Sequence, residues 1–81
     1  MTEALSDKIA KIMVESLFLE LQPEDINPET PLADYGVDSF LLLELLSALE
    51  QEFSLSLNPA DISADNLRTL AALTALVQSK L

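Results

Sequence analysis

A hydroxyl and a carboxylate stand next to each other at a predicted helix start. The segment Gly36-Val37-Asp38-Ser39 leads directly into an apolar run over residues 40–46. Gly36 can adopt a positive φ and end the incoming loop sharply. Asp38 is a strong N-cap residue, because its carboxylate can accept the free N–H groups of the next turn. The Ser39 hydroxyl is then presented where another protein can reach it, although the same residues also suit a plain helix start.

The chain offers little else from which to build an active site. It contains no cysteine and no histidine, so it lacks a thiol, the commonest general base and the commonest metal ligand. Gly36-x-x-Ser39 is not a nucleophile elbow, since Leu41 occupies the place of the closing glycine. The aspartates do not have the spacing of a calcium loop. We therefore expect no enzyme, no catalytic residue and no metal site.

A longer pattern surrounds the serine. It comprises residues 32–39, Glu44-Leu45 and Ala48-Leu49-Glu50-Gln51-Glu52-Phe53, and it extends to Ile9-Ala10-Lys11-Ile12 and Asn66-Leu67-Arg68-Thr69-Leu70. In these residues the chain resembles the acyl and peptidyl carrier protein family, in which the serine of a Gly-x-Asp-Ser-Leu motif carries 4′-phosphopantetheine. The resemblance implies that a phosphopantetheinyl transferase attaches this group from coenzyme A to Ser39. It also implies that Asp38 helps to place the serine and the metal-bound coenzyme A.

The family role follows from the arm of the cofactor. Its thiol, which the cysteine-free chain lacks, would hold an acyl or aminoacyl group as a thioester. The implied partners are the transferase, an acyl- or aminoacyl-loading enzyme, an acyltransferase, and a ketosynthase or condensation enzyme. The carrier itself would be a substrate of these enzymes.

Several residues depart from the commonest family pattern. Phe40 replaces the usual leucine after the serine, and Leu41, Leu42 and Leu43 stand where fatty acid synthase carriers place acidic residues. These departures favour a freestanding carrier of a polyketide, nonribosomal peptide or related specialised pathway, of the kind that makes antibiotics. Two alternatives stay open. The chain could serve primary fatty acid synthesis, or it could be an unmodified helical adaptor that binds partners through its acidic face.

Negative charge dominates the chain. The net charge is −10, from 14 acidic and 4 basic residues, and no basic residue lies between Ile12 and Leu67. Such a surface repels nucleic acid and anionic membranes and attracts proteins with basic patches, although it also serves solubility alone. No stretch is long and apolar enough to span a bilayer, and the N-terminus lacks the pattern of a signal peptide. We expect a cytoplasmic monomer.

The apolar spacing predicts an all-α fold. We expect one domain over residues 1–81, a small helical bundle of three main helices plus one short helix, with a long first loop over 23–37. The main helices are predicted over residues 3–21, over 39–53 and from the cap signal at Asp65-Asn66 to about Lys80. A short helical turn is expected over 58–62, with Ile62 turned inward.

The helix after Ser39 has two distinct faces. Leu42, Leu45, Leu46, Leu49 and Phe53 fall together and are expected to face the core. On the outer side, apolar and acidic side chains cluster around the serine, although scattered apolar residues on a surface are ordinary. We expect this outer side to dock partner enzymes through transient contacts. The predicted partner-binding residues are Asp34, Phe40, Leu43, Glu44, Ser47 and Glu50.

Overall fold

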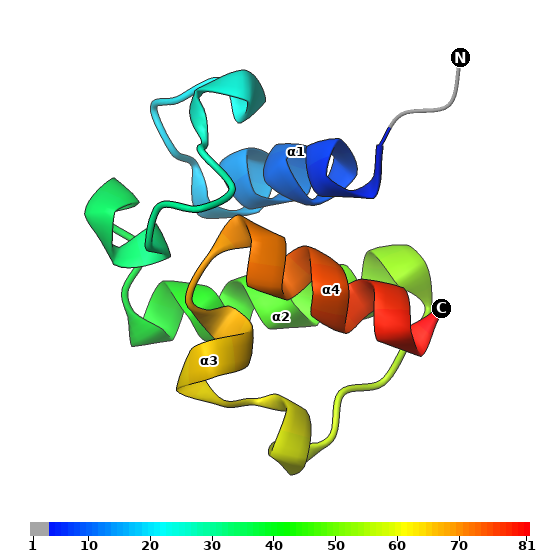
Figure 1. Ribbon diagram of the computed structural model, residues 1–81. Coiled ribbons are helices and arrows are strands. Elements are labelled where there is room, and N and C mark those ends of the chain that lie inside the picture. The colour runs from blue at the N-terminus through cyan, green and yellow to red at the C-terminus, as the bar shows by residue number, and fades with distance from the viewer. Residues whose placement is uncertain (1–3) are drawn as a thin grey trace.

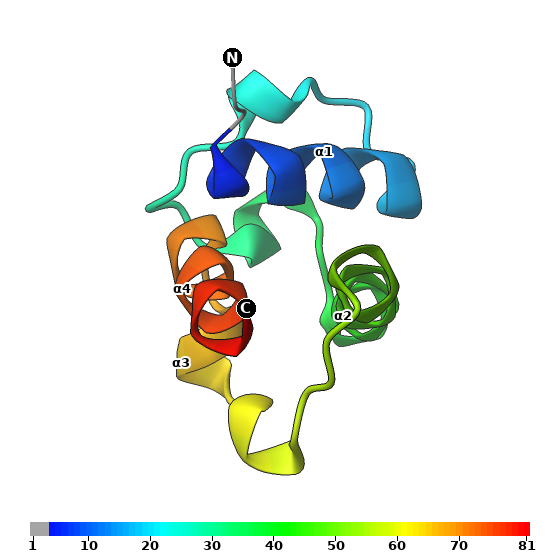
Figure 2. The same ribbon diagram turned by 90° about the vertical axis from the view of Figure 1, so that its right-hand side faces the viewer.

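Three long helices build the molecule. The computed structural model describes residues 4–81. Its helices are α1 (Leu5–Leu17), α2 (Ser39–Phe53), α3 (Ala64–Leu67) and α4 (Leu70–Lys80). In Figure 1 α1 lies above α2 and α4, and Figure 2 shows α2 and α4 on opposite sides below α1. The predicted all-α bundle of three main helices and a short one is confirmed.

The core forms where the three long helices meet. Its largest fully buried side chains are Ile9 and Met13 of α1, Leu45 and Leu49 of α2, and Leu73 and Val77 of α4. Within each helix the two residues are four positions apart, which puts them on one face. Burial of each such side chain contributes about 1.5–3 kcal/mol. Within residues 4–81, no helix is long and apolar enough to cross a membrane.

The first helix ends earlier than its apolar pattern predicts. The prediction extended it to Leu21, but α1 ends at Leu17, because Phe18 adopts the left-handed conformation (φ 53°, ψ 43°). The Phe18 and Leu19 N–H groups both donate to the Val14 carbonyl, which closes the helix. The predicted start at Glu3 lies outside the described residues.

The long first loop is more ordered than predicted. It contains two 3₁₀ turns, η1 (Pro23–Asp25) and η2 (Leu32–Tyr35). Ile26 and Leu32 are buried and anchor the loop to the core. The Tyr35 hydroxyl accepts a 2.8 Å hydrogen bond from the Asn27 N–H, so one end of the loop holds the other.

The C-terminal third differs from the prediction in two ways. A single last helix was expected, but α3 and α4 are separate helices because Thr69 caps the second one. Its Oγ1 accepts a 3.1 Å hydrogen bond from the Ala72 N–H. The predicted turn before α3 is present as η3 (Pro59–Asp61), yet Ile62 is 44% exposed and not turned inward. This turn directs Asp61 against α4 instead, through a 2.7 Å ion pair with Lys80.

Candidate functional site

The chain is turned sharply just before α2. Gly36 lies in the left-handed region (φ 83°, ψ 13°), which a residue with a side chain rarely adopts, and its N–H donates to the Ala33 carbonyl over 3.0 Å. Val37 follows and is buried in the core. The turn at Gly36 and the anchor at Val37 together bring Asp38 and Ser39 to the surface, where both are exposed.

Asp38 caps α2 as predicted. Its backbone is extended (φ −91°, ψ −177°), and its Oδ1 accepts a 2.9 Å hydrogen bond from the Leu41 N–H. The Asp38 carbonyl accepts from the Leu42 N–H, also over 2.9 Å, which is the first bond of the helix. The Asp38 carboxylate therefore binds the backbone of the first turn of α2. Ser39 follows it as the first residue of the helix.

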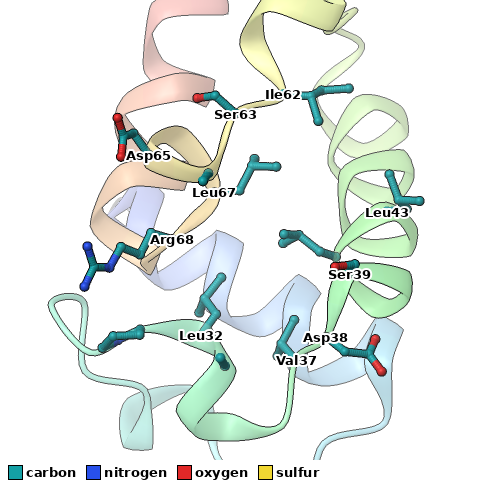
Figure 3. A pocket seen from close by; sticks show the side chains of 14 residues that line it. Leu32, Val37, Asp38, Ser39, Leu43, Ile62, Ser63, Asp65, Leu67 and Arg68 are labelled. Atoms are coloured by element: carbon teal, nitrogen blue, oxygen red, sulfur yellow. The ribbon is translucent and has the colours of Figure 1, made fainter.

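The Ser39 hydroxyl lies at the edge of an apolar groove (Figure 3). Among residues 4–81, no hydrogen bond engages this hydroxyl. The groove has a volume of about 830 Å³ and separates the start of α2 from the segment that contains Ile62 and α3. The leucine, isoleucine and valine side chains of its lining are Leu32, Val37, Leu42, Leu43, Ile62 and Leu67. The site thus combines an accessible hydroxyl with an adjoining apolar surface.

The opposite wall of the groove was missed in the sequence. Ile62 is predicted to turn inward, and Leu67 falls within the single last helix that the cap signal at Asp65-Asn66 predicts. Both line the groove, and Leu67 is at the same time buried. The signal that could have identified this wall is a pair of cap residues, Ser63 and Thr69, which mark two separate helix starts.

Four of the predicted partner-binding residues share the outer surface of α2. Phe40 is 69% exposed and Leu43 is 57% exposed, and Glu44 and Ser47 are exposed beside them. We call these four residues the outer face of α2. Asp34 is also exposed, in η2 before the turn at Gly36.

Glu50 differs from the expected exposed rim residue. It is half-buried, and its Oε2 accepts a 2.9 Å hydrogen bond from the Leu57 N–H. The carboxylate therefore holds the connection that follows α2. This contact spans seven residues, so helix periodicity alone does not reveal it.

Positive charge is scarce around the site. The segment from Ile12 to Leu67 contains 12 acidic residues and no basic one. The first cation beyond it, Arg68, lies at the far edge of the groove, and its guanidinium points away from Ser39 in Figure 3. The hydroxyl is thus approached across an acidic surface, which favours partners that carry positive charge.

Comparison with known proteins identifies the family. A family model described as a phosphopantetheine attachment site matches residues 7–77. The chain is 33% identical over 57 residues to aminoacyl carrier protein 2 of Bradyrhizobium diazoefficiens, covering 70% of this chain and 64% of that protein. It is 36% identical over 59 residues to highly reducing polyketide synthase 2 of Gibberella zeae, covering 73% of this chain and 2% of the synthase. The chain thus spans less than two thirds of the length of either relative.

A solved structure shows the same fold. The solution structure of a holo acyl carrier protein from Nitrosomonas europaea superposes with a TM-score of 0.81 at 23% identity, covering 95% of both chains. Taken with the match over residues 7–77, the chain belongs to the phosphopantetheine-binding family. The cofactor of this family is 4′-phosphopantetheine, which is therefore the cofactor of this chain.

Proposed function

We propose that Ser39 is the residue that carries 4′-phosphopantetheine. The observation that supports this most strongly is the hydroxyl itself: it is exposed at the first residue of α2, and within residues 4–81 it makes no hydrogen bond. A transferase can reach it without unfolding any part of the chain. The cofactor supplies a thiol that forms thioesters. The protein holds the cofactor in position and presents the surface that partner enzymes recognise.

The residues around Ser39 suit such a group. A phosphate attached to the Ser39 Oγ would lie near the N-terminus of a helix of 15 residues, where the helix dipole favours negative charge. Asp38 holds the first turn of α2 through the Leu41 N–H, so the serine keeps a fixed position. The groove beside Ser39 offers apolar surface to an attached arm and its cargo.

We further infer that the carrier serves a specialised pathway. Relatives of this chain are named as an aminoacyl carrier protein and as polyketide synthases, which supports a cargo outside primary fatty acid synthesis. The exposed Phe40 and Leu43 give the outer face of α2 an apolar character that a general fatty acid carrier does not need. A dedicated set of partner enzymes accounts for this surface, with Asp34 and Glu44 as the acidic rim around it.

Intact mass spectrometry tests the attachment residue. The wild type and the variants Ser39→Ala and Ser56→Ala are incubated with coenzyme A and a broad-specificity phosphopantetheinyl transferase. Ser56 is an exposed serine in the connection after α2, outside the predicted docking surface, and serves as the control. We expect the wild type and Ser56→Ala to gain the mass of one phosphopantetheine and Ser39→Ala to gain none. If the wild type keeps its apo mass while a control carrier is modified, the chain is an unmodified adaptor.

A separate experiment tests the pathway. The gene replaces the carrier of fatty acid synthesis in a bacterial strain that depends on it, and growth is measured. We expect no growth, because the outer face of α2 suits other partners. Full complementation would show instead that the chain serves primary fatty acid synthesis.

A further inference from the structure

Phe18 is a large apolar side chain with almost no cover. It follows α1 directly and is 88% exposed, the largest exposed fraction among the large hydrophobic residues of the described chain. Its neighbours Leu19 and Leu21 are half-buried and pack against the core. The ring of Phe18 is therefore directed to solvent while the adjacent leucines are not.

The backbone of Phe18 makes this choice of residue unfavourable for folding. It adopts φ 53° and ψ 43° at the C-cap of α1, a position where glycine or asparagine is favoured. Phe18 therefore combines a strained backbone conformation with an exposed ring. Packing within residues 4–81 does not offset the cost of the left-handed backbone, because the ring is exposed.

The end of α1 and the start of α2 lie on the same side of the molecule (Figure 1). The whole structure measures 33 × 29 × 20 Å, with a solvent-accessible surface of 5064 Å². A specific protein interface covers about 800 Å² on each partner. An interface of that size centred on Ser39 therefore extends over much of this side, toward the end of α1 that Phe18 caps.

The surroundings of Phe18 indicate the charge of the partner. Glu15, Glu20 and Glu24 are exposed in the segments on either side of it. No basic residue occurs from Ile12 to Leu67. An exposed ring within an acidic surface complements an apolar pocket surrounded by lysine and arginine side chains.

We propose that Phe18 is an anchor for the phosphopantetheinyl transferase of the same host. The proposal rests on the assignment of Ser39 as the modified residue. A transferase must bring coenzyme A to the serine hydroxyl itself, so its surface has to cover the protein around Ser39. The ring would fill an apolar pocket of the transferase, and the acidic residues around it would meet the basic rim.

The experiment separates the anchor from the helix cap. We compare Phe18→Asn and Phe18→Tyr with Ser54→Asn, because Ser54 is also an exposed C-cap in the left-handed conformation (φ 51°), at the end of α2 away from Ser39. The melting temperature and the kcat/KM of modification by the host transferase are measured for each. Asparagine tolerates this conformation, so we expect both asparagine variants to melt at or above the wild-type temperature.

Only one variant should lose activity. We expect Phe18→Asn to lower kcat/KM about tenfold, as the loss of an aromatic anchor does at protein interfaces. Phe18→Tyr keeps the ring and Ser54→Asn leaves the site intact, so both should react like the wild type. An unchanged rate for Phe18→Asn would overturn the proposal, as would a lower melting temperature, which would give the ring a folding role.

Two further outcomes would also count against the proposal. A wild-type dimer that dissociates in Phe18→Asn, measured by sedimentation, would show that a second copy of the chain covers the ring. If the wild type is not modified at all while a control carrier is, the assignment of Ser39 fails together with the anchor. If Phe18→Asn is modified slowly but still to completion, the result would support both the assignment of Ser39 and the anchor role of Phe18.

Discussion

The backbone N–H of Leu32 donates a 2.8 Å hydrogen bond to the carbonyl of Arg68. A second bond, from the Ala71 N–H to the Pro28 carbonyl over 3.0 Å, joins the same two segments. The long first loop is thereby fixed to the junction between α3 and α4. The loop leads to Ser39, and the junction comes directly after α3, which lines the opposite wall of the groove. The two hydrogen bonds therefore connect the two sides of the site.

We predict that Thr69→Ala weakens this junction. The substitution removes the hydrogen bond from the Ala72 N–H to the Thr69 Oγ1 and leaves α4 without its N-cap. The loss of such a cap costs about 1 kcal/mol, which lowers the melting temperature of a domain of this size by about 4–8 °C. Thermal unfolding followed by circular dichroism measures the change. Ser56→Ala, at an exposed position in a connection, is the control. Equal melting of Thr69→Ala and the wild type would show that the cap does not hold the junction.

Leu46→Ala should destabilise the bundle strongly. Leu46 is 4% exposed, and its truncation leaves a cavity in the core. Such substitutions cost about 2–5 kcal/mol, which is much of the stability of a small domain. Leu43→Ala is the matched control on the same helix, because Leu43 is 57% exposed and its loss should cost little. Urea unfolding of the two variants measures the difference, and similar midpoints would mean that α2 presents a different face to the core.

The ion pair of Asp61 predicts a pH-dependent contribution to stability. The hydrogen bond from the Lys80 ammonium, aided by the Asn58 N–H, holds the pKa of the Asp61 carboxyl below its ordinary value. A carboxyl whose pKa is lowered by folding stabilises the fold above its unfolded pKa of about 3.9, and this contribution is lost as the pH falls through the lower folded value.

The variant Asp61→Asn tests this contribution. We expect it to melt below the wild type at pH 7 and the difference to shrink as the pH is lowered below about 4, where the wild type loses the same charge. Melting temperatures of both proteins across pH 2.5–7 measure the difference directly. A difference that stays constant over this range would show that the ion pair with Lys80 contributes nothing to it.

Charge reversal on the outer face of α2 should slow partner enzymes. Glu44→Lys places a cation on the outer face of α2, where we propose that basic enzymes bind. We expect slower modification by the transferase at low salt, with the gap to the wild type narrowing as salt rises, because exposed charges are screened over about 8 Å at physiological ionic strength. Glu29→Lys makes the same charge change at an exposed loop position and should react like the wild type. Equal rates for all three proteins at low salt would remove Glu44 from the docking surface.

Local chemistry made the centre of the site predictable. Gly36, Asp38 and Ser39 lie where the sequence places them, because a left-handed turn and an N-cap depend on the few residues around them. The core face of α2 was equally predictable, since residues four positions apart in a helix share one face. These features need no knowledge of the rest of the chain.

Features set by tertiary contacts were not predictable in the same way. The early end of α1 depends on Phe18 in a conformation that its residue type disfavours. Glu50 was expected at the rim, but it binds the Leu57 N–H across seven positions. Ile62 faces the groove because the neighbouring Asp61 pairs with Lys80, which lies far away in the sequence. Periodicity carries no information about such partners.

The most direct test of Ser39 as the carrier residue is peptide mapping of the chain purified from its own host. The protein is digested, and fragment spectra locate any phosphopantetheine, with or without an acyl or aminoacyl group, to a single residue. We predict one such group, on Ser39. A group found on Ser47, Ser63 or any other residue, or a chain without one under conditions in which other carriers of that host are loaded, would contradict the account.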